Sequence, residues 1–327
     1  MEEFCRFALN SSSLTDRARQ LRCELSAAIG RLDAAKLISS RDTLGDVGAG
    51  RAVDSRLART NLNDSFTAGC KRLTEALRVL AEMTQTLNPD IAQTIEKLRY
   101  DAYTLEKDIV LLSEPAEKFK RVKLYVIISS SLPADVISLT QRCTAGGADC
   151  IQLRAKDADD DKLFALAAEF VQMCRADGVL SIINDRIDIA VAAGADGVHL
   201  GQNDLPIEYA HKLELAPLII GKSTHSLEQL RAACKELPTY VSLGPVFSTG
   251  TKPTAEPVGL DYIKRATEIL TDTGVGHVVI GGITLDNVQE VLKAGAKAVA
   301  VCSAVTESSN STEACRALKE KIDAFGR

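Results

Sequence analysis

The segment GPVFSTGTK, residues 244–252, combines two glycines, three hydroxyl side chains and a lysine. It approaches the nucleotide-binding pattern G-x-x-x-x-G-K-[ST], but the spacing differs by one residue and Thr251 precedes Lys252 instead of following it. Backbone amides, hydroxyls and a lysine still suit the binding of a phosphate. We therefore interpret the segment as an anion-binding loop that differs from the nucleotide-binding loop.

Other polar residues lie at the ends of short apolar runs in the second half of the chain. They are Gln152, Arg154, Lys156, Asn184, Asp185, Asp204, Ser223, Cys302 and Ser303, together with the pair Gly281-Gly282. If the runs are parallel strands of a barrel, the loops at their carboxyl ends converge on one rim, where barrel enzymes build their active sites. We therefore expect these residues to lie together.

The residue types at this rim predict a site for a diphosphate and a metal ion. The cations Arg154, Lys156 and Lys252 suit a diphosphate better than a single phosphate. The carboxylates of Asp185 and Asp204 come from neighbouring strands and suit Mg²⁺, a hard ion that shares itself with phosphate oxygens. Together these groups predict one diphosphate site that contains Mg²⁺.

The hydroxyls and backbone amides predict a second site, for a monophosphate without metal. Its residues are Thr249, Thr251, Gly282 and Ser303. Barrel enzymes frequently bind a phosphate near the loops that follow strands seven and eight. The segment 244–252 then faces two different anions with its threonines and its lysine.

Each of these residues also has an ordinary structural explanation when it is taken alone. Arg154 and Lys156 could be surface cations, and Asp185 and Asp204 could cap the helices that follow them. The two glycines could form a tight turn. His199, inside an apolar run, is more typical of a hydrogen-bonded core residue than of a catalyst. Only their convergence on one rim favours the functional interpretation.

The elements that would position the site are eight apolar runs that alternate with helical patterns. The runs are LYVII at 124, CIQL at 150, SII at 181, GVHL at 197, LII at 218, YVSL at 240, HVVI at 277 and AVAV at 298. Continuously apolar runs are typical of parallel strands buried on both faces. Eight such units predict a (β/α)8 TIM barrel over residues 118–327, because a doubly wound sheet usually has fewer strands.

Residues 1–117 have the periodicity of helices and predict an all-α domain. Apolar residues recur at helical spacing at Leu21, Leu25, Ile29 and Leu32, then at Leu73, Leu77, Leu80 and Leu87, and then at Ile91, Ile95, Leu98, Leu105, Ile109 and Leu112. Asn88-Pro89 fits the start of the last helix. The glycine- and aspartate-rich residues 40–55 predict a loop.

Composition limits the class of partner and the compartment. The net charge of -5 and the pI near 5.6 argue against a nucleic-acid-binding protein. Nine cysteines without a C-x-x-C pair predict reduced thiols rather than disulfides or zinc. The acidic N-terminus lacks an apolar signal segment, and no run approaches a membrane span. We expect a cytoplasmic protein with small-molecule partners and leave a homo-oligomer open.

The motifs QLRAK, INDR, GVHLGQND, GKSTH, GPVFSTGTK, GGI and VCSAV, in this order across residues 123–327, resemble the thiamine phosphate synthase family. The resemblance implies a transferase with a (β/α)8 barrel. It joins hydroxymethylpyrimidine diphosphate to a thiazole phosphate and releases pyrophosphate, with Mg²⁺ as cofactor. One departure is visible, since Ala155 stands where the family usually has an acidic residue.

The resemblance also implies roles for individual residues, which agree with the two-site interpretation. It implies that the pyrimidine diphosphate is bound by Gln152, Arg154, Lys156, Asn184, Ser223 and Lys252. It implies that Asp185 and Asp204 bind Mg²⁺. The thiazole phosphate would be bound by Thr249, Thr251, Gly282, Cys302 and Ser303. Arg154, Lys156 and Lys252 would stabilise the charge that grows on the leaving group.

The helical half resembles, through SRDTLGDVG and TNLNDSFTAGCKRLTEALRVLAEM, a domain fused ahead of this synthase in some bacteria. For that domain the resemblance implies a hydroxymethylpyrimidine-phosphate kinase activity. No nucleotide-binding signature is present, so a packing or oligomerisation module is an equal alternative. Arg41, Asp42 and Asp46 are the candidate residues of a kinase site.

Two rival functions remain for the barrel. A thiazole-phosphate isomerase similar to the tautomerase relatives of the synthase would need the monophosphate site but not the cations and carboxylates of the diphosphate site. A non-catalytic ligand sensor, with the helical half as its effector, would release no pyrophosphate. The complete diphosphate set favours the synthase over the isomerase.

Overall fold

The computed structural model describes residues 1–42, 44–45, 59, 61–213, 217–249 and 256–325. The chain forms two compact units, Met1–Val110 and Leu111–Arg327. The division between them falls inside one helix, α4 (Pro89–Phe119). The domain boundary that we place after residue 117 stays a prediction.

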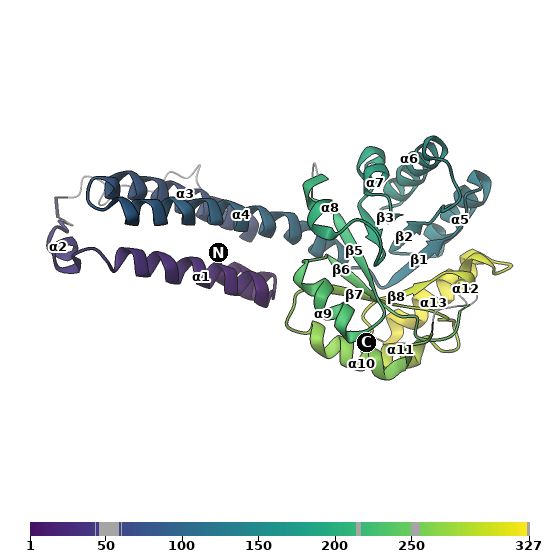
Figure 1. The fold of residues 1–327 in the computed structure, drawn as a ribbon. Helices are drawn as coiled ribbons and strands as arrows, with labels where there is room; N and C mark the ends of the chain where they lie inside the picture. The colour runs from purple at the N-terminus through teal and green to yellow at the C-terminus, as the bar shows by residue number, and fades with distance from the viewer. Residues whose placement is uncertain (43, 46–58, 60, 214–216, 250–255, 326–327) are drawn as a thin grey trace. The chain divides into compact units, whose positions relative to one another are not determined.

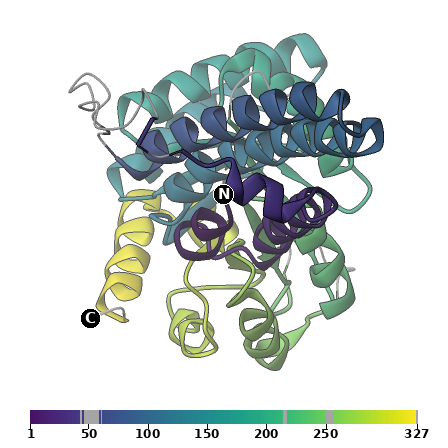
Figure 2. The ribbon, with the colours of Figure 1, turned by 90° about the vertical axis from the view of Figure 1, so that its left-hand side faces the viewer.

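The first unit, here the helical unit, is built from helices. Its elements are η1 (Phe4–Ala8), α1 (Ser12–Ile29), α2 (Ala34–Ser39), α3 (Leu62–Gln85) and the part of α4 up to Val110. α3 and α4 lie side by side (Figure 1, Figure 2). Leu77, Ile91 and Ile95 are buried between them together with Ala28 of α1. Among the described residues, no helix combines the length and the apolarity needed to cross a bilayer.

Three details of the N-terminal helices differ from the sequence prediction. α1 ends at Ile29 and α3 at Gln85, so Leu32 and Leu87 lie beyond the helices to which their spacing assigned them, and Leu87 is 72% exposed. α2 was not predicted; the side chain of Asp33 caps it by accepting from the amides of residues 35 and 36. α4 continues through Pro115 to Phe119, because Phe119 is buried and anchors the end of the helix.

The second unit, here the barrel, is a closed parallel sheet in the order β1 to β8, as predicted. Its strands are β1 (Leu124–Ile128), β2 (Cys150–Leu153), β3 (Leu180–Asn184), β4 (Gly197–Leu200), β5 (Ile219–Thr224), β6 (Tyr240–Leu243), β7 (Gly276–Ile280) and β8 (Val299–Val301). β1 and β8 close the barrel, with Tyr125 opposite Ala300. Each strand is followed by helical segments that surround the strands (Figure 1).

The helices of the barrel follow the strands in turn. They are α5 (Pro133–Ala145), α6 (Asp160–Ala176), α7 (Ile187–Ala193), α8 (Ile207–Leu213), α9 (Leu227–Lys235), α10 (Gly259–Leu270), α11 (Val288–Lys293), α12 (Ser303–Thr306) and α13 (Ser311–Phe325). Because side chains alternate along a strand, each strand feeds two cores. Val126 and Val241 belong to the core beneath the helices, whereas Tyr125, Ile182 and Tyr240 belong to the core inside the barrel.

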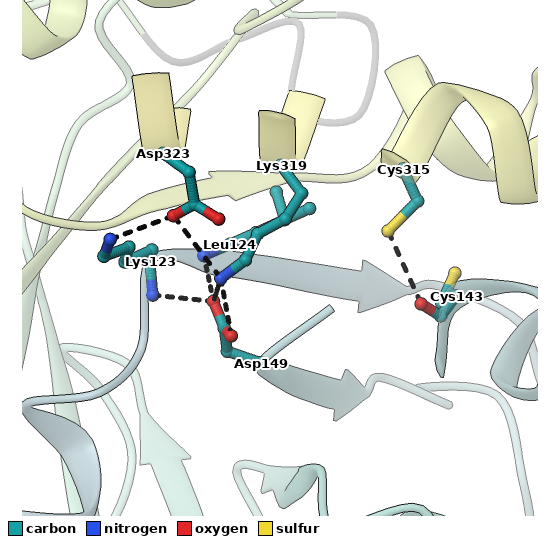
Figure 3. Close-up of polar contacts among 7 residues, drawn as sticks. All are labelled: Lys123, Leu124, Cys143, Asp149, Cys315, Lys319 and Asp323. Atoms are coloured by element: carbon teal, nitrogen blue, oxygen red, sulfur yellow. Dashed lines mark hydrogen bonds and ion pairs between the residues drawn. The ribbon is translucent and has the colours of Figure 1, made fainter. Parts of the chain in front are cut away.

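The amino ends of β1 and β2 are joined by a polar cluster around Asp149 (Figure 3). The Asp149 carboxylate accepts from the backbone amides of Lys123 and Leu124 at 2.9 and 2.8 Å. Lys319 of α13 donates to the same carboxylate at 2.6 and 2.7 Å, and Asp323 pairs with the Lys123 ammonium at 2.9 Å. These contacts attach the last helix to the first strand, at the opposite ends of the strands from the predicted site.

Candidate functional site

Two predicted cations follow β2 at the carboxyl rim of the barrel. Arg154 comes directly after the strand, and its Nη1 donates to Ser129 Oγ at 2.8 Å. The Lys156 ammonium lies 3.5 Å from the carboxylate of Asp185, the first residue after β3. Lys156 is 52% exposed at its side chain, so its charge is available to a ligand at the rim.

Two carboxyl groups meet at this rim. Asp185 has a positive φ of 63°, a conformation that aspartate tolerates better than most residues, and its amide donates to the His199 carbonyl at 2.8 Å. Burial raises the pKa of the Asp185 carboxyl above its ordinary value, and the hydrogen bond and charge of Asp204 raise this pKa further, against the lowering effect of Lys156. A carboxyl group whose ionised form is disfavoured by a neighbouring carboxyl group favours a bound cation.

The protein supplies only some of the ligands that an Mg²⁺ ion needs. Among the described residues, no group of three or more His, Cys, Asp or Glu side chains could hold a metal ion. Mg²⁺ usually keeps several waters and binds through one or two carboxylates together with the phosphates of a substrate. Asp185 and Asp204 therefore fit a magnesium site that a diphosphate completes.

The loop after β4 is held in a defined shape. Within it, the Asp204 carboxylate accepts from the Gly201 amide at 2.6 Å. Lys222 of β5 is only 6% exposed and donates to the Gly201 carbonyl at 2.9 Å. Gln202 donates to the backbone carbonyl of Ser223. Contacts from β5 thus fix the loop that carries Asp204.

Two further predicted residues point into the barrel and are joined by buried polar side chains. Gln152 Nε2 donates to the Tyr125 hydroxyl at 2.9 Å, and this hydroxyl lies 2.9 Å from that of Tyr240. The Tyr240 hydroxyl lies 3.0 Å from His199 Nδ1, and His199 Nε2 lies 2.9 Å from Ser223 Oγ. The structure therefore connects Gln152 in β2 with Ser223 in β5. His199 is buried and hydrogen-bonded, as expected of a core residue, and it lies between two predicted site residues.

The remaining predicted residues lie on the side of the rim formed by β6, β7 and β8. Gly282 has a φ of 63°, and a Cβ there would lie 2.5 Å from the Ser248 carbonyl, so only glycine allows the loop after β6 to pass this closely. Thr249 is the next residue of that loop. Cys302 follows β8 and packs against the interior core, and Ser303 begins α12. Thr251 and Lys252 lie outside the described residues.

Sequence reasoning missed Tyr125, Tyr240 and Lys222. The alternation of side chains along the strands could have indicated the two tyrosines. Gln152, His199 and Ser223 point into the barrel, and Tyr125 and Tyr240 point to the same side. Lys222 gave no such signal, since a lysine at a strand end is usually exposed.

The nine cysteines are free thiols. Burial raises the pKa of the Cys143 thiol to about 12 and that of Cys315 to about 11, so neither is an activated nucleophile. Cys315 instead donates to the carbonyl of Cys143 at 3.5 Å, which ties α13 to α5 (Figure 3).

The helical unit contains a cavity of about 380 Å³ between α1, α3 and α4. Its lining includes Leu21, Leu25, Leu73, Leu77 and Leu98, and the lining residues Glu2 and Arg22 pair with each other. Of the candidate kinase residues, Asp42 accepts from the Gly45 amide at 2.8 Å within its own turn, and Asp46 lies outside the described residues. The cavity is apolar and offers little to a phosphate.

A closed eight-stranded parallel barrel with cations and carboxylates on its carboxyl rim defines the class of α/β-barrel enzymes. Within this class, residues 124–305 match the family described as thiamine monophosphate synthase, and residues 1–108 match the ThiD2 family. The chain therefore belongs to the thiamine monophosphate synthase family and is a transferase of thiamine biosynthesis.

Individual relatives resemble the chain over nearly its whole length. It is 36% identical over 322 residues to a thiamine-phosphate synthase of Synechocystis, covering 98% of this chain and 91% of the relative. It is 35% identical to the thiamine-phosphate synthase of Rhodopirellula baltica, covering 99% and 88%. The solved thiamine phosphate pyrophosphorylase of Pyrococcus furiosus is 35% identical with a TM-score of 0.58, and covers 64% of this chain and 98% of its own.

Proposed function

We propose that the barrel joins hydroxymethylpyrimidine diphosphate to a thiazole phosphate and forms thiamine phosphate and pyrophosphate. The observation that carries this proposal is the pair of interacting carboxylates, Asp185 and Asp204, beside the Lys156 ammonium. An isomerase of a thiazole phosphate has no use for such a group, whereas a diphosphate with Mg²⁺ needs both charges.

The pyrimidine diphosphate binds on the β2 to β5 side of the rim in this proposal. Gln152, Asn184 and Ser223 lie at the carboxyl parts of their strands and supply hydrogen bonds to the pyrimidine. Arg154 and Lys156 face the diphosphate, together with Lys252 of the loop after β6.

Asp185 and Asp204 would hold Mg²⁺, which supplies positive charge to the diphosphate oxygens when it is bound. Lys222 and Gln202 support this role by fixing the loop on which Asp204 lies. Lys156 both lowers the pKa of Asp185 and contributes charge of its own, so it favours the ionised carboxylate that a metal ion requires.

The chemistry needs no nucleophile from the protein. Cleavage of the bond between the pyrimidine methylene and the diphosphate leaves a ring-stabilised cation, and the negative charge of the leaving group grows toward Arg154 and Lys156. The thiazole nitrogen then attacks with its own lone pair, so no general base is required. The protein contributes charge stabilisation and orientation.

The thiazole phosphate binds on the β6 to β8 side in this proposal. Its ligands are hydroxyl groups and backbone amides, which hold a monophosphate without a metal ion. They come from Thr249, Thr251, Gly282, Cys302 and Ser303. The close passage of the loop after β6 over Gly282 supports this grouping.

The test is incubation of the full chain with both substrates and Mg²⁺. We expect thiamine phosphate and pyrophosphate in equal amounts. Binding of both ligands without pyrophosphate release would identify a sensor instead, and conversion of the thiazole phosphate alone would identify an isomerase. Either result contradicts the proposal.

For the helical unit we propose phosphorylation of the pyrimidine monophosphate, on the strength of the ThiD2 match over residues 1–108. The test is formation of the diphosphate from the pyrimidine monophosphate and ATP by the full chain. Its absence, in protein whose synthase activity is intact, would assign the unit to packing.

Nine free thiols also support our proposal of a cytoplasmic location, where thiols stay reduced.

A further inference from the structure

Five side chains form a continuous buried hydrogen-bond chain across the inside of the barrel. In order they are Gln152, Tyr125, Tyr240, His199 and Ser223, and the four links between them measure 2.9, 2.9, 3.0 and 2.9 Å. The first four are between 0 and 8% exposed, and only Ser223 reaches the more open rim. Both ends of the chain are residues that we place at the pyrimidine.

Burial fixes how many protons the chain contains. Desolvation raises the pKa of Tyr125 and of Tyr240 well above the ordinary value of a phenol, so each keeps one proton on its oxygen. A buried hydroxyl whose proton has no acceptor is unfavourable. The Tyr125 hydroxyl also hydrogen-bonds with the buried Cys150 thiol, a weak acceptor, so the oxygen or nitrogen next in the chain is the preferred acceptor of each tyrosine proton.

The amide nitrogen at one end sets the direction of the whole chain. Gln152 Nε2 can only donate, so the Tyr125 oxygen accepts from it and passes its own proton to the Tyr240 oxygen. Tyr240 then donates to His199 Nδ1, which leaves the proton of the neutral imidazole on Nε2. His199 Nε2 donates to Ser223 Oγ, and the proton of Ser223 is directed away from the chain.

Packing holds the central tyrosine of the chain in place. A Cβ at Gly221 would lie 2.2 Å from the Tyr240 ring, so the glycine makes the space that this ring fills. The Phe119 ring stacks on the Tyr240 ring, with ring centroids 4.1 Å apart and planes 8° from parallel. Gly221 and Phe119 thus both pack against the Tyr240 ring and support its present orientation.

We propose that Tyr125, Tyr240 and His199 are positioning residues that fix which hydrogen-bonding groups the two ends of the chain present. Gln152 keeps its carbonyl oxygen as an acceptor and the second hydrogen of Nε2 as a donor, and Ser223 presents its hydroxyl as a donor. The ligand between them must offer an N–H group to Gln152 and an unprotonated nitrogen or an oxygen to Ser223. An aminopyrimidine carries both groups, so this inference rests on the proposed function and specifies how the pyrimidine is selected.

A spectroscopic measurement on the unaltered full chain tests the direction. With ¹⁵N-labelled histidine, the His199 signals, assigned by their loss in His199→Gln, should show a proton on Nε2 and none on Nδ1. A proton on Nδ1, alone or together with Nε2, would overturn the proposal. This result does not depend on synthase activity, so the polarity of the chain and the proposed function can fail separately.

Kinetics test the consequence. Tyr240→Phe keeps the ring and removes the link, so the KM for the pyrimidine diphosphate should rise about tenfold, the equivalent of one lost hydrogen bond of about 1.4 kcal/mol, while the KM for the thiazole phosphate stays unchanged. Tyr262→Phe is the matched control, because its hydroxyl contacts Thr224 at 3.3 Å outside the chain. Equal changes in both KM values, or no change in either, would contradict a positioning role.

Discussion

Buried polar side chains of the helical unit and those inside the barrel sheet find their partners in different ways. Thr15, Thr74 and Thr84 of the helical unit donate to carbonyls three or four residues earlier in their own helices. In the barrel, Gln152 reaches Tyr125 across 27 residues of sequence and His199 reaches Tyr240 across 41. Self-contained bonds leave a helix free to serve as packing, whereas bonds between strands fix side chains relative to one another, as a binding site requires.

The largest effect should come from the carboxylate pair. Asp185→Asn keeps the shape of the side chain but removes a charge that the proposed Mg²⁺ ion needs, so we expect the synthase rate to fall about a hundredfold, or about 3 kcal/mol of transition-state stabilisation. Asp188→Asn is the control, since Asp188 pairs with Arg186 at the start of α7. Initial rates at saturating Mg²⁺ measure both; a loss of similar size in the two variants would contradict the assignment.

His277, a buried side chain of β7, should make the free energy of unfolding depend on pH. Burial, with a smaller contribution from Lys297, lowers the pKa of His277 to about 4 from 6.5, and its Nε2 accepts from the Lys297 amide at 3.1 Å. The unfolded chain binds this proton more readily than the folded chain. The free energy of unfolding should therefore fall by about 3 kcal/mol as the pH drops from 6.5 to 4.

The control for this prediction is His277→Asn, which cannot take up a proton. Urea denaturation at several pH values should show a smaller loss of stability on acidification in His277→Asn than in the unaltered protein. Identical slopes for the two proteins between pH 6.5 and 4 would show that His277 is not the group responsible.

A smaller effect is expected at the buried lysine of β5. Lys222→Met leaves the Gly201 carbonyl without its donor, at a cost of about 1–3 kcal/mol, and loosens the loop that carries Asp204. The Mg²⁺ concentration for half-maximal rate should rise. Lys212→Met removes an exposed ion pair with Glu208. It should change neither the free energy of unfolding nor the Mg²⁺ concentration for half-maximal rate. An unchanged Mg²⁺ requirement in Lys222→Met would exclude a role for this lysine at the proposed metal site.

The smallest effect is expected in the helical unit. Thr74→Val removes a hydroxyl that bonds only to carbonyls of its own helix, so the free energy of unfolding should change by less than about 1 kcal/mol. Synthase activity should not change. A loss of activity would show that the two units are less distinct than their hydrogen bonds indicate.

The sequence predicted the strands of the barrel and the site residues that follow them, but not the buried side chains beneath the site. Apolar runs marked all eight strands because parallel strands are buried on both faces, and motif positions such as Lys156 and Asp185 follow strands as expected. Periodicity could not show that Leu87 lies past the end of α3, since a helix end depends on capping and packing. The contact of Tyr125 with Tyr240 depends on closure of the barrel, which joins residues far apart in sequence.

The most direct test of the difference between the two units is the activity of a fragment that begins at residue 118. The similarity to the Pyrococcus furiosus structure supports such a fragment. It extends over 98% of that protein but over only 64% of this chain. The fragment retains Phe119, which packs beneath Tyr240 inside the barrel. We predict that the folded fragment makes thiamine phosphate from the two supplied substrates at the rate of the full chain. A fragment that unfolds cooperatively yet forms no thiamine phosphate would contradict the account, because residues before 118 would then belong to the site.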